Sequence, residues 1–275
     1  MMERERKAYP RFGKEYIHWD GSANNILATV RSEESGYRWK RALEAFNLSG
    51  TERILELGAG RCWASYLFAR FGCQAIAVDF NADDVTGLGA GTTLCRSADT
   101  HFERVAAEIS HMPFQDLSFD AIFCNAVLHH LINLEKVMRE TYRVLRAGGI
   151  FVATCEHKLG ILESDEAFRS KQASVQYGAN EHSLSYRKYL AVLKTAGFCA
   201  EVTFDGKYEE DMVSGRFDLS SPKGKIALAL LSCLGKERLR KLIHLYPIKR
   251  LLMEVVGLDV MIVGRKSGTR TLQEK

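Results

Sequence analysis

The chain of 275 residues has few prolines and no long apolar run. It contains four prolines, and its longest apolar stretch, 226–234, is about half of the roughly 18 residues that a membrane-spanning helix requires. The first 11 residues are polar and charged, without the apolar segment of a secretory signal. We therefore expect a globular protein of the cytoplasm, in one large domain or one domain with an insertion.

The cysteines are not arranged as pairs. None of the seven forms a Cys-x-x-Cys motif and the number is odd, so neither a disulfide framework nor a zinc site is indicated. A metal site built from Cys62, Cys124 and Cys155 would be feasible near strand ends, but nothing in their spacing asks for it. We expect a reducing compartment and no metal. The cysteines stand at positions 62, 73, 95, 124, 155, 199 and 233.

Charge is unevenly distributed. The net charge is +4, but residues 222–252 hold eight Lys or Arg and one acid, so the rest of the chain is net negative. Because the basic segment is local, we do not expect a nucleic-acid-binding protein. Two interpretations of it stay open. It packs as a helical lid with Leu239, Leu242, Ile243 and Tyr246 inward, or it contacts an acidic substrate, partner or anionic surface.

The most informative stretch is an apolar segment that ends in glycines. Residues 54–60 read Ile-Leu-Glu-Leu-Gly-Ala-Gly, and residues 75–79 read Ala-Ile-Ala-Val-Asp. This pattern predicts a buried strand, a tight turn, a helix and a second buried strand that ends in an acid. Gly58 and Gly60 let the backbone pass close under a ligand, where a Cβ atom would clash. An acid about 20 residues further on can accept hydrogen bonds from ribose hydroxyls, so Asp79 indicates a nucleoside-containing ligand.

Two common nucleotide sites are not indicated. A dinucleotide fingerprint needs a third glycine, and Trp63 occupies that position. No Gly-Lys-Ser/Thr follows the turn, so the phosphate-binding P-loop is missing. Glu56, just before the turn, would repel a pyrophosphate and suits a cationic or zwitterionic ligand. A NAD(P)-dependent oxidoreductase is therefore the weaker alternative.

Strand-like and helix-like segments alternate as far as residue 156. Such alternation is typical of parallel βαβ units and predicts an α/β fold with a doubly wound, mostly parallel sheet. Residues 157–184 are polar and loop-like, and a helical segment at 223–253 should break at Gly235 and near Pro247. The expected strands are 53–57, 74–79, 104–107, 121–125, 150–155, 200–204 and 258–263; the expected helices are 36–46, 63–71, 134–145 and 185–196.

Ordered motifs in this chain resemble those of the class I S-adenosylmethionine (SAM)-dependent methyltransferases, most closely those that act on small molecules. Together they cover about residues 50–205. The resembling parts are the first motif at 56–60, the ribose-binding acid Asp79, the adenine segment at 107–114, the fourth-strand motif at 119–130, the turn at 145–149 and the end of a late helix at 193–198.

The resemblance implies a Rossmann-like sheet of seven strands, with SAM as the cofactor and a helical cap inserted before the last strand. It implies a lid or substrate segment at 1–50, a SAM-binding core at 51–205, a basic helical insertion at 206–257, and the last strand with a polar tail at 258–275. The residues that it implies for SAM binding are Glu56, Gly58, Ala59, Gly60, Asp79, Phe80, Glu108, Ile109 and Asn125.

Two positions depart from the family pattern. The usual third glycine falls at Cys62, so the turn must accommodate a side chain there. Glu108 stands where aspartate is more usual, which lengthens the reach to adenine by one methylene.

The resemblance also implies a reaction, the in-line transfer of a methyl group from SAM to a small-molecule acceptor. His129 and His130 follow the fourth strand and His182 lies in a later loop, and a pKa near neutrality suits histidine as a general base for a protonated acceptor. The acceptor, its reacting atom and the oligomeric state stay open. So do a SAM-dependent reaction of another type and a non-catalytic binding or scaffold module on this fold.

Overall fold

A computed structural model describes residues 2–205, 207, 210, 211, 214, 229 and 232–268. Most of the predicted basic segment before residue 232, and the polar tail after residue 268, lie outside these residues. Within the described residues, no helix has the length and apolar character needed to cross a membrane.

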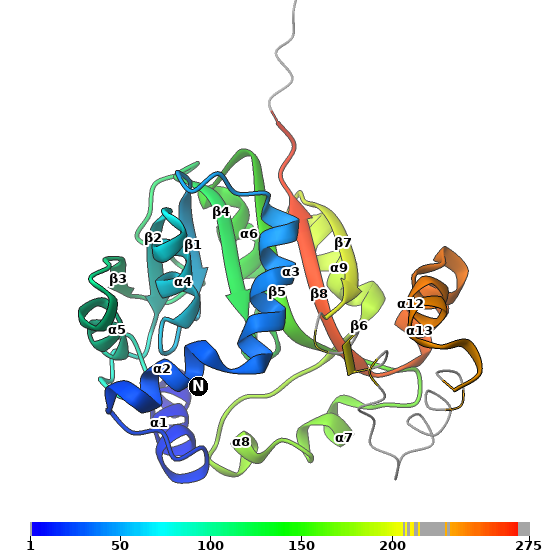
Figure 1. The fold of residues 1–275 in the computed structure, drawn as a ribbon, viewed down its shortest axis with the longest axis horizontal. Helices are drawn as coiled ribbons and strands as arrows, with labels where there is room; N and C mark the ends of the chain where they lie inside the picture. The colour runs from blue at the N-terminus through cyan, green and yellow to red at the C-terminus, as the bar shows by residue number, and fades with distance from the viewer. Residues whose placement is uncertain are drawn as a thin grey trace, which may run out of the picture.

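The centre of the molecule is one mixed sheet in the order β3-β2-β1-β4-β5-β8-β7, with β6 paired to the end of β5 (Figure 1). β8 runs antiparallel to β5 and β7, and the other pairs are parallel. The predicted fold class is confirmed. The strands are β1 (Arg53–Leu57), β2 (Gln74–Asp79), β3 (Glu103–Ala106), β4 (Phe119–Asn125), β5 (Leu145–Leu159), β6 (Leu184–Ser185), β7 (Cys199–Phe204) and β8 (Leu258–Arg265).

Helices cover both faces of the sheet (Figure 1). α3 (Glu33–Phe46), α4 (Trp63–Phe71) and α5 (Ala90–Ala98) contribute to one apolar core, and α6 (Leu134–Val144) and α9 (Tyr186–Thr195) contribute to the other. Along β1, Leu55 and Leu57 belong to the second core and Ile54 to the first. Burial on both faces explains why the strand is continuously apolar.

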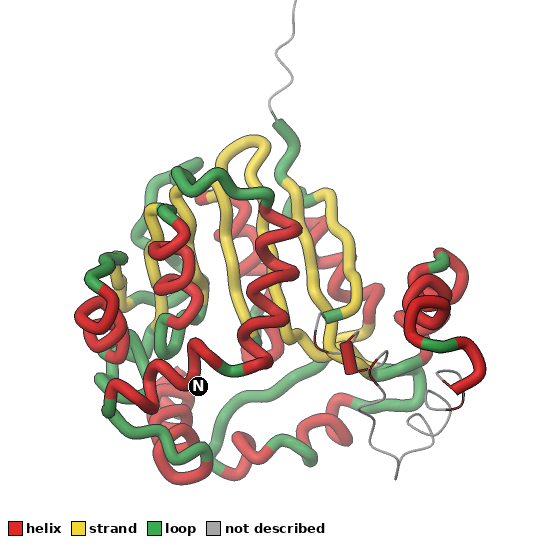
Figure 2. Tube along the Cα trace, in the orientation of Figure 1, coloured by secondary structure: helices red, strands yellow, loops and turns green. Residues whose placement is uncertain are grey.

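Short helices gather at the ends of the central parallel strands (Figures 1 and 2). α1 (Met2–Arg11), the π-helical turn η1 (Phe12–Tyr16) and α2 (Ala23–Arg31) form an N-terminal layer there. α7 (Asp165–Arg169) and α8 (Ala173–Gln176) form a second layer. The prediction of a loop over 157–184 was wrong. Backbone pairing with β8 and β6 extends β5 to Leu159, and the short helices α7 and α8 follow. At the end of the segment, β6 begins at Leu184.

β5 is also longer than predicted at its start. Gly148 and Gly149 exchange backbone hydrogen bonds with Lys266, each 3.0 Å long. The pairing with the last part of the chain keeps these glycines in the sheet, although a glycine pair usually signals a helix end.

The basic segment contains two described helices, α12 (Lys236–His244) and α13 (Tyr246–Val255). The predicted breaks are confirmed: Gly235 has a φ of +73°, and Leu245 leaves the helical conformation before α13 begins. Leu239 and Ile243 are buried as predicted. The prediction for Tyr246 was wrong, because the break at Leu245 rotates this side chain away from the stripe and leaves it 74% exposed.

Candidate functional site

A cavity of about 960 Å³ lies at the carboxyl ends of β1, β2 and β4, beneath the N-terminal layer. This is where open α/β sheets bind ligands, beside the point at which the strand order reverses between β1 and β4. Its walls include every residue that the sequence analysis singled out for SAM. These are Glu56, Gly58, Ala59, Gly60, Asp79, Phe80, Glu108, Ile109 and Asn125.

The turn after β1 brings bare backbone to the cavity. Gly58 and Gly60 have φ angles of +60° and +47°, a region that side chains rarely adopt. A Cβ atom at Gly58 would lie 2.7 Å from Cγ2 of Val127, so no side chain fits there. A Cβ atom at Gly60 would meet nothing within 4 Å. Gly60 therefore faces open space in which a ligand can approach the main chain.

Cys62, at the position of the family's third glycine, also has a left-handed backbone, with φ +62° and ψ +27°. The side chain is fully buried, and Sγ lies 3.6 Å from the carbonyl oxygen of Gly60. A non-glycine residue in this conformation costs about 1–2 kcal/mol. The turn thus keeps the conformation of a glycine turn while it accommodates a thiol.

Asp79 fixes the turn from the end of β2. Its Oδ2 accepts a hydrogen bond from the Gly60 amide at 2.8 Å, and its Oδ1 accepts one from the Asn81 amide at 2.7 Å. Burial raises the pKa of this carboxyl group, and the amide donors oppose that rise. Each carboxylate oxygen can accept a further hydrogen bond. Asp79 can therefore hold the turn and still receive two hydroxyl groups from the cavity.

Glu56 joins the cavity wall to the start of α4. Its Oε2 accepts hydrogen bonds from the amide and the hydroxyl of Ser65, at 2.7 Å and 2.5 Å. Ser65 lies in the first turn of α4, where unpaired amides and the helix dipole favour a carboxylate. Burial raises the pKa of Glu56 to about 7.

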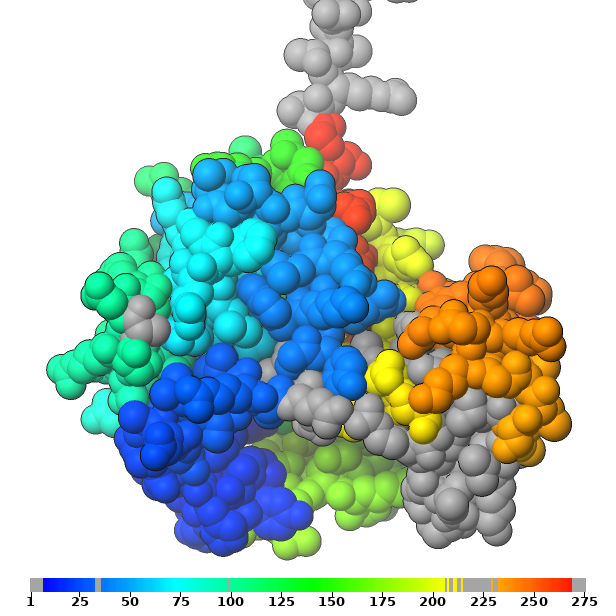
Figure 3. Space-filling model, in the orientation of Figure 1, coloured from blue at the N-terminus to red at the C-terminus, as the bar shows by residue number. Residues whose placement is uncertain are grey.

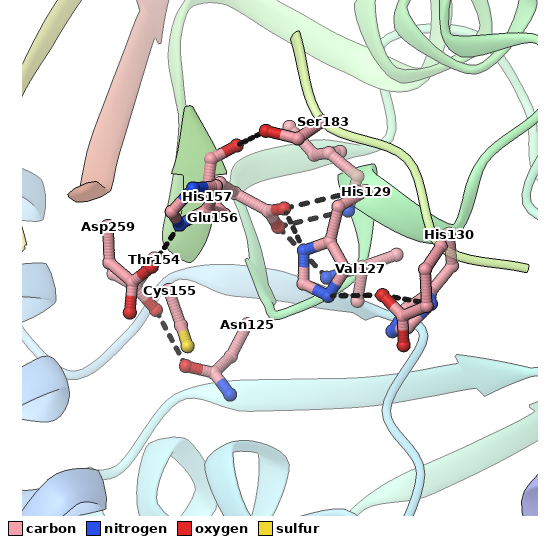
Figure 4. Close-up of polar contacts among 12 residues, drawn as sticks. Asn125, Val127, His129, His130, Thr154, Cys155, Glu156, His157, Ser183 and Asp259 are labelled. Atoms are coloured by element: carbon pink, nitrogen blue, oxygen red, sulfur yellow. Dashed lines mark hydrogen bonds and ion pairs between the residues drawn. The ribbon is translucent and has the colours of Figure 1, made fainter. Parts of the chain in front are cut away.

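Glu108 and Asn125 differ in how firmly they are held. Glu108 is exposed at the cavity rim. Asn125 is half-buried at the end of β4, and its Oδ1 accepts a hydrogen bond from Oγ1 of Thr154 at 3.0 Å (Figure 4). With the carbonyl oxygen held in this way, the amide nitrogen of Asn125 is the group left for a ligand.

His129 belongs to a buried ionic cluster behind the cavity. The carboxylate of Glu156 accepts hydrogen bonds from the backbone amides of Val127, Leu128 and His129. Its Oε2 also lies 2.8 Å from Nδ1 of His129 (Figure 4). Nε2 of His129 lies 3.8 Å from a carboxylate oxygen of Glu181. Burial lowers the pKa of His129, but the two carboxylates outweigh it and the net shift is upward. His129 is held between two carboxylates that favour its protonated form, and it is not part of the cavity wall.

His130 lines the cavity and is held in one orientation. Nδ1 lies 2.8 Å from the carbonyl oxygen of Asn180, whose side chain donates back to the carbonyl oxygen of His130 at 2.8 Å. A carbonyl oxygen can only accept, so Nδ1 carries the proton and Nε2 has a lone pair. Nε2 accepts from the hydroxyl of Tyr9, another cavity residue. Burial and the charge of His129 set the pKa of His130 well below its ordinary value.

His182 is tied to the neighbouring layer. Its Nδ1 lies 3.0 Å from Oδ2 of Asp165, and its amide donates to the carbonyl oxygen of His129 at 2.6 Å. Among the described residues that form the cavity wall, His182 does not occur. Of the three predicted catalytic histidines, the structure brings one, His130, to the cavity.

Comparisons with known proteins agree with this geometry. A family model described as a methyltransferase domain matches residues 55–153, which run from β1 into β5. A demethylmenaquinone methyltransferase of Mycolicibacterium gilvum (strain PYR-GCK) is 33% identical over 141 residues, which are 50% of this chain and 58% of that protein. The chain thus spans little more than half the length of that curated relative.

Among solved structures, phosphoethanolamine N-methyltransferase 2 of Haemonchus contortus, in complex with S-adenosyl-L-methionine, has a TM-score of 0.63 at 15% identity, over 95% of this chain and 60% of that one. Residues 55–153 thus match a methyltransferase domain, and the chain shares the fold of this solved methyltransferase structure. The fold also serves other chemistry: the [4+2]-cyclase SpnF is similar with a TM-score of 0.60 at 15% identity, over 96% of each chain.

The N-terminal layer is attached to the glycine turn through Arg61. The guanidinium donates to Oγ1 of Thr29 at 2.8 Å and to Oδ1 of Asn25 at 2.9 Å, and it lies over the ring of Trp19 at 4.9 Å from the centroid. Arg61 stands next to Gly60 in the chain. The position of the layer is therefore coupled to the backbone that faces the cavity.

Replacing Arg61 by alanine should loosen this layer. Hydrogen bonds to a charged group contribute about 1.5–3 kcal/mol, so we expect faster hydrogen–deuterium exchange over residues 18–32 and a lower melting temperature. Arg31→Ala is the matched control, because Arg31 is an exposed arginine on α2 without an ion pair among the described residues. Unchanged exchange in Arg61→Ala would show that the attachment lies elsewhere.

Two residues of the candidate site had no distinct signal in the sequence. Tyr9 lies in the polar segment MERERKAYPR, and its partner His130 is 121 positions away. Arg61 resembles any solvated arginine next to a glycine turn. Its buried contacts come from a layer whose position no local motif predicts.

Proposed function

We propose that this chain is a methyltransferase, which binds SAM in the cavity and transfers its methyl group to a small-molecule acceptor. One observation supports this most: nine residues from four separate segments, each singled out for SAM from the sequence, line a single cavity. The open space at Gly60 and the paired acceptor oxygens of Asp79 fit a nucleoside that approaches the turn.

SAM, when bound, supplies an electrophilic methyl group on a sulfonium. In our proposal Asp79 accepts the two ribose hydroxyls, the turn at Gly58 and Gly60 lies against the methionine part, and Glu108 with Ile109 borders the adenine. Glu56 is buried beneath the turn and orients it through α4. The main contribution of the chain is to hold acceptor and methyl donor in line in a cavity closed by the N-terminal layer.

We assign the role of general base to His130. Its Nε2 has the lone pair and accepts a hydrogen bond from the hydroxyl of Tyr9, which also lines the cavity. With SAM bound, the acceptor hydroxyl would pass its proton to Tyr9 while the Tyr9 proton passes to Nε2 of His130. The methyl–sulfur bond of SAM would break as the acceptor oxygen bonds to the methyl carbon, and S-adenosylhomocysteine would leave. His129, Glu156 and Asn180 hold the imidazole in position and are positioning residues rather than catalytic ones.

The side of the cavity near His130 supports an apolar acceptor with an ionisable hydroxyl group. Leu131 and Ile132, which follow His130 in the chain, line the cavity, as do Ile17 and Trp19 of the N-terminal layer. A quinol-type acceptor, as the name of the curated relative suggests for that protein, meets this description. Other apolar hydroxyl compounds meet it equally well.

Calorimetry tests the cofactor. We expect SAM and S-adenosylhomocysteine to bind at micromolar levels or tighter, about −8 kcal/mol, and NAD not to bind. Asp79→Ala should weaken SAM binding by about 1.5–3 kcal/mol, because charge-assisted hydrogen bonds to the ribose are lost. Asp83→Ala, an acid in the loop after β2 that does not line the cavity, is the control. Equal affinity in wild type and Asp79→Ala would remove Asp79 from the site.

Product analysis separates methyl transfer from its alternatives. Incubation with labelled SAM and a panel of apolar hydroxyl compounds should give a labelled acceptor and S-adenosylhomocysteine. Consumption of an acceptor that gains no label would favour another reaction on this fold. The likeness to a [4+2]-cyclase makes a cyclisation of that kind a specific alternative. SAM binding without any reaction would favour a scaffold module.

We also propose a surface contact and a compartment. Lys236, Arg238 and Lys241 are exposed on α12 and present positive charge suited to an anionic surface. All seven cysteines are free thiols, and those at 199 and 233 are exposed, which suits the reducing cytoplasm.

A further inference from the structure

Large apolar side chains stand in solvent along α13 and in the loop after β5. Leu162 is 95% exposed and Ile161 is 72% exposed. On α13, Leu251 and Val255 are four residues apart and share one face, at 60% and 42% exposure. Single exposed leucines are ordinary, but a contiguous group of this size marks an interaction site. We call Ile161, Leu162, Leu251 and Val255 the apolar ridge.

Backbone contacts make the ridge one surface. The Ile161 amide donates to the carbonyl oxygen of Val255 at 3.1 Å. A Cβ atom at Gly160 would lie 2.5 Å from the nitrogen of Gly257 and 2.6 Å from the oxygen of Val255. Only glycine allows this approach, so the loop after β5 is fixed against the end of α13 (Figure 1).

Ion pairs fix the orientation of α13. Glu254 pairs with Arg187 of α9 at 3.0 Å, and Lys249 pairs with Glu201 of β7 at 2.9 Å. Met253 is buried in the core. Lys249 and Met253, four residues apart, engage one face of the helix and Glu254 engages a second, so the face with Leu251 and Val255 is left to solvent. Figure 3 shows α12 and α13 (orange) at the side of the molecule away from the N-terminal layer (blue).

Positive charge borders the ridge. Lys236, Arg238 and Lys241 on α12 and Arg250 on α13 are exposed, and none of them forms an ion pair within the described part of the chain. Arg240, by contrast, pairs with Glu210 and Glu237. Apolar side chains flanked by uncompensated cations are complementary to a lipid surface with anionic headgroups.

We propose that the apolar ridge docks this chain on an anionic phospholipid bilayer. Ile161, Leu162 and Leu251 enter the boundary between headgroups and acyl chains, and the cations of α12 contact the phosphates. The proposal extends the surface contact proposed for α12, but it does not rest on methyl transfer. A bilayer is favoured over a protein partner because exposed cations without an ion pair among the described residues border the apolar side chains.

Vesicle sedimentation of the full chain tests this. We expect binding to phosphatidylcholine vesicles that contain phosphatidylglycerol. Leu162→Asp with Leu251→Asp should lower the partition coefficient about tenfold or more at every salt concentration. Replacing Lys236, Arg238 and Lys241 by Gln should lower it about fivefold for each charge. The loss of binding caused by these three Gln replacements should shrink as salt rises, because the Debye length falls from about 10 Å at 0.1 M salt to about 3 Å at 1 M.

Leu117→Asp is the matched control, because Leu117 is 50% exposed in the turn before β4, at the amino end of that strand, whereas Ile161 and Leu162 follow the carboxyl end of β5. Calorimetry with SAM on each variant checks the fold and separates this test from that of the proposed function. No binding to any vesicle, or wild-type binding by the double aspartate variant, would overturn insertion of the ridge. Equal binding to pure phosphatidylcholine would overturn the anionic preference. If the wild type is a dimer and the double aspartate variant is a monomer, the ridge is instead the interface with a second copy of the chain.

Discussion

Gly60→Val should abolish SAM binding and leave the fold intact. The wild-type residue has a φ of +47°, and its missing Cβ points into open space at the cavity. A valine there fills the volume through which the proposed ligand approaches the backbone. The strain of a branched residue at positive φ is about 1–2 kcal/mol, which a domain with a stability of about 5–15 kcal/mol survives. Calorimetry should show no heat of binding with SAM.

Gly148→Val isolates the steric effect from the backbone strain. Gly148 has a φ of +77°, and a Cβ atom there also meets nothing within 4 Å, but it lies in β5 beside Lys266 and away from the cavity. Both variants should melt a few degrees lower, and only Gly60→Val should lose SAM. Retained affinity in Gly60→Val would show that the turn does not approach the ligand.

The turn and its strands were predictable because local rules fix them. β1, β2 and α4 begin and end at the residues that apolar runs and flanking glycines indicate. Asp79 follows from the same rules, since an acid at the end of the second strand must lie beside a turn at the end of the first. The half of the candidate cavity that we propose for the cofactor could therefore be predicted from short-range sequence patterns and from the parallel sheet that they imply.

The acceptor half was not predictable in the same way. Tyr9 contacts His130 across 121 positions, and Arg61 reaches residues of α2 that no motif places over the cavity. In the sequence alone, His129 and His130 are equal candidates for a catalytic residue. Their roles differ in the structure because Nδ1 of His129 contacts the carboxylate of Glu156, whereas Nδ1 of His130 contacts the carbonyl oxygen of Asn180. Such choices depend on distant partners that bury and orient each ring, and the pattern of residues does not encode them locally.

The second large effect is expected at His130. Replacing it by glutamine should lower kcat about 10²–10⁴-fold, the usual contribution of a general base. SAM affinity should stay near that of the wild type, because the ring contacts Tyr9 and Asn180 rather than the turn. Tyr9→Phe should lower kcat as well, since the hydroxyl that carries the proton to Nε2 is lost. Steady-state kinetics with the acceptor found by product analysis measures both.

The pH profile distinguishes a base from a structural residue. The pKa of His130 is depressed, so Nε2 stays unprotonated as pH falls through about 6.5, the ordinary value for histidine. Acceptor turnover in the wild type should therefore be level from neutral pH through that point and decline only in more acidic solution, and the decline should vanish in His130→Gln. His101→Gln, at an exposed histidine outside the cavity wall, should keep the wild-type profile. A decline that persists in His130→Gln would assign the titrating base to another group.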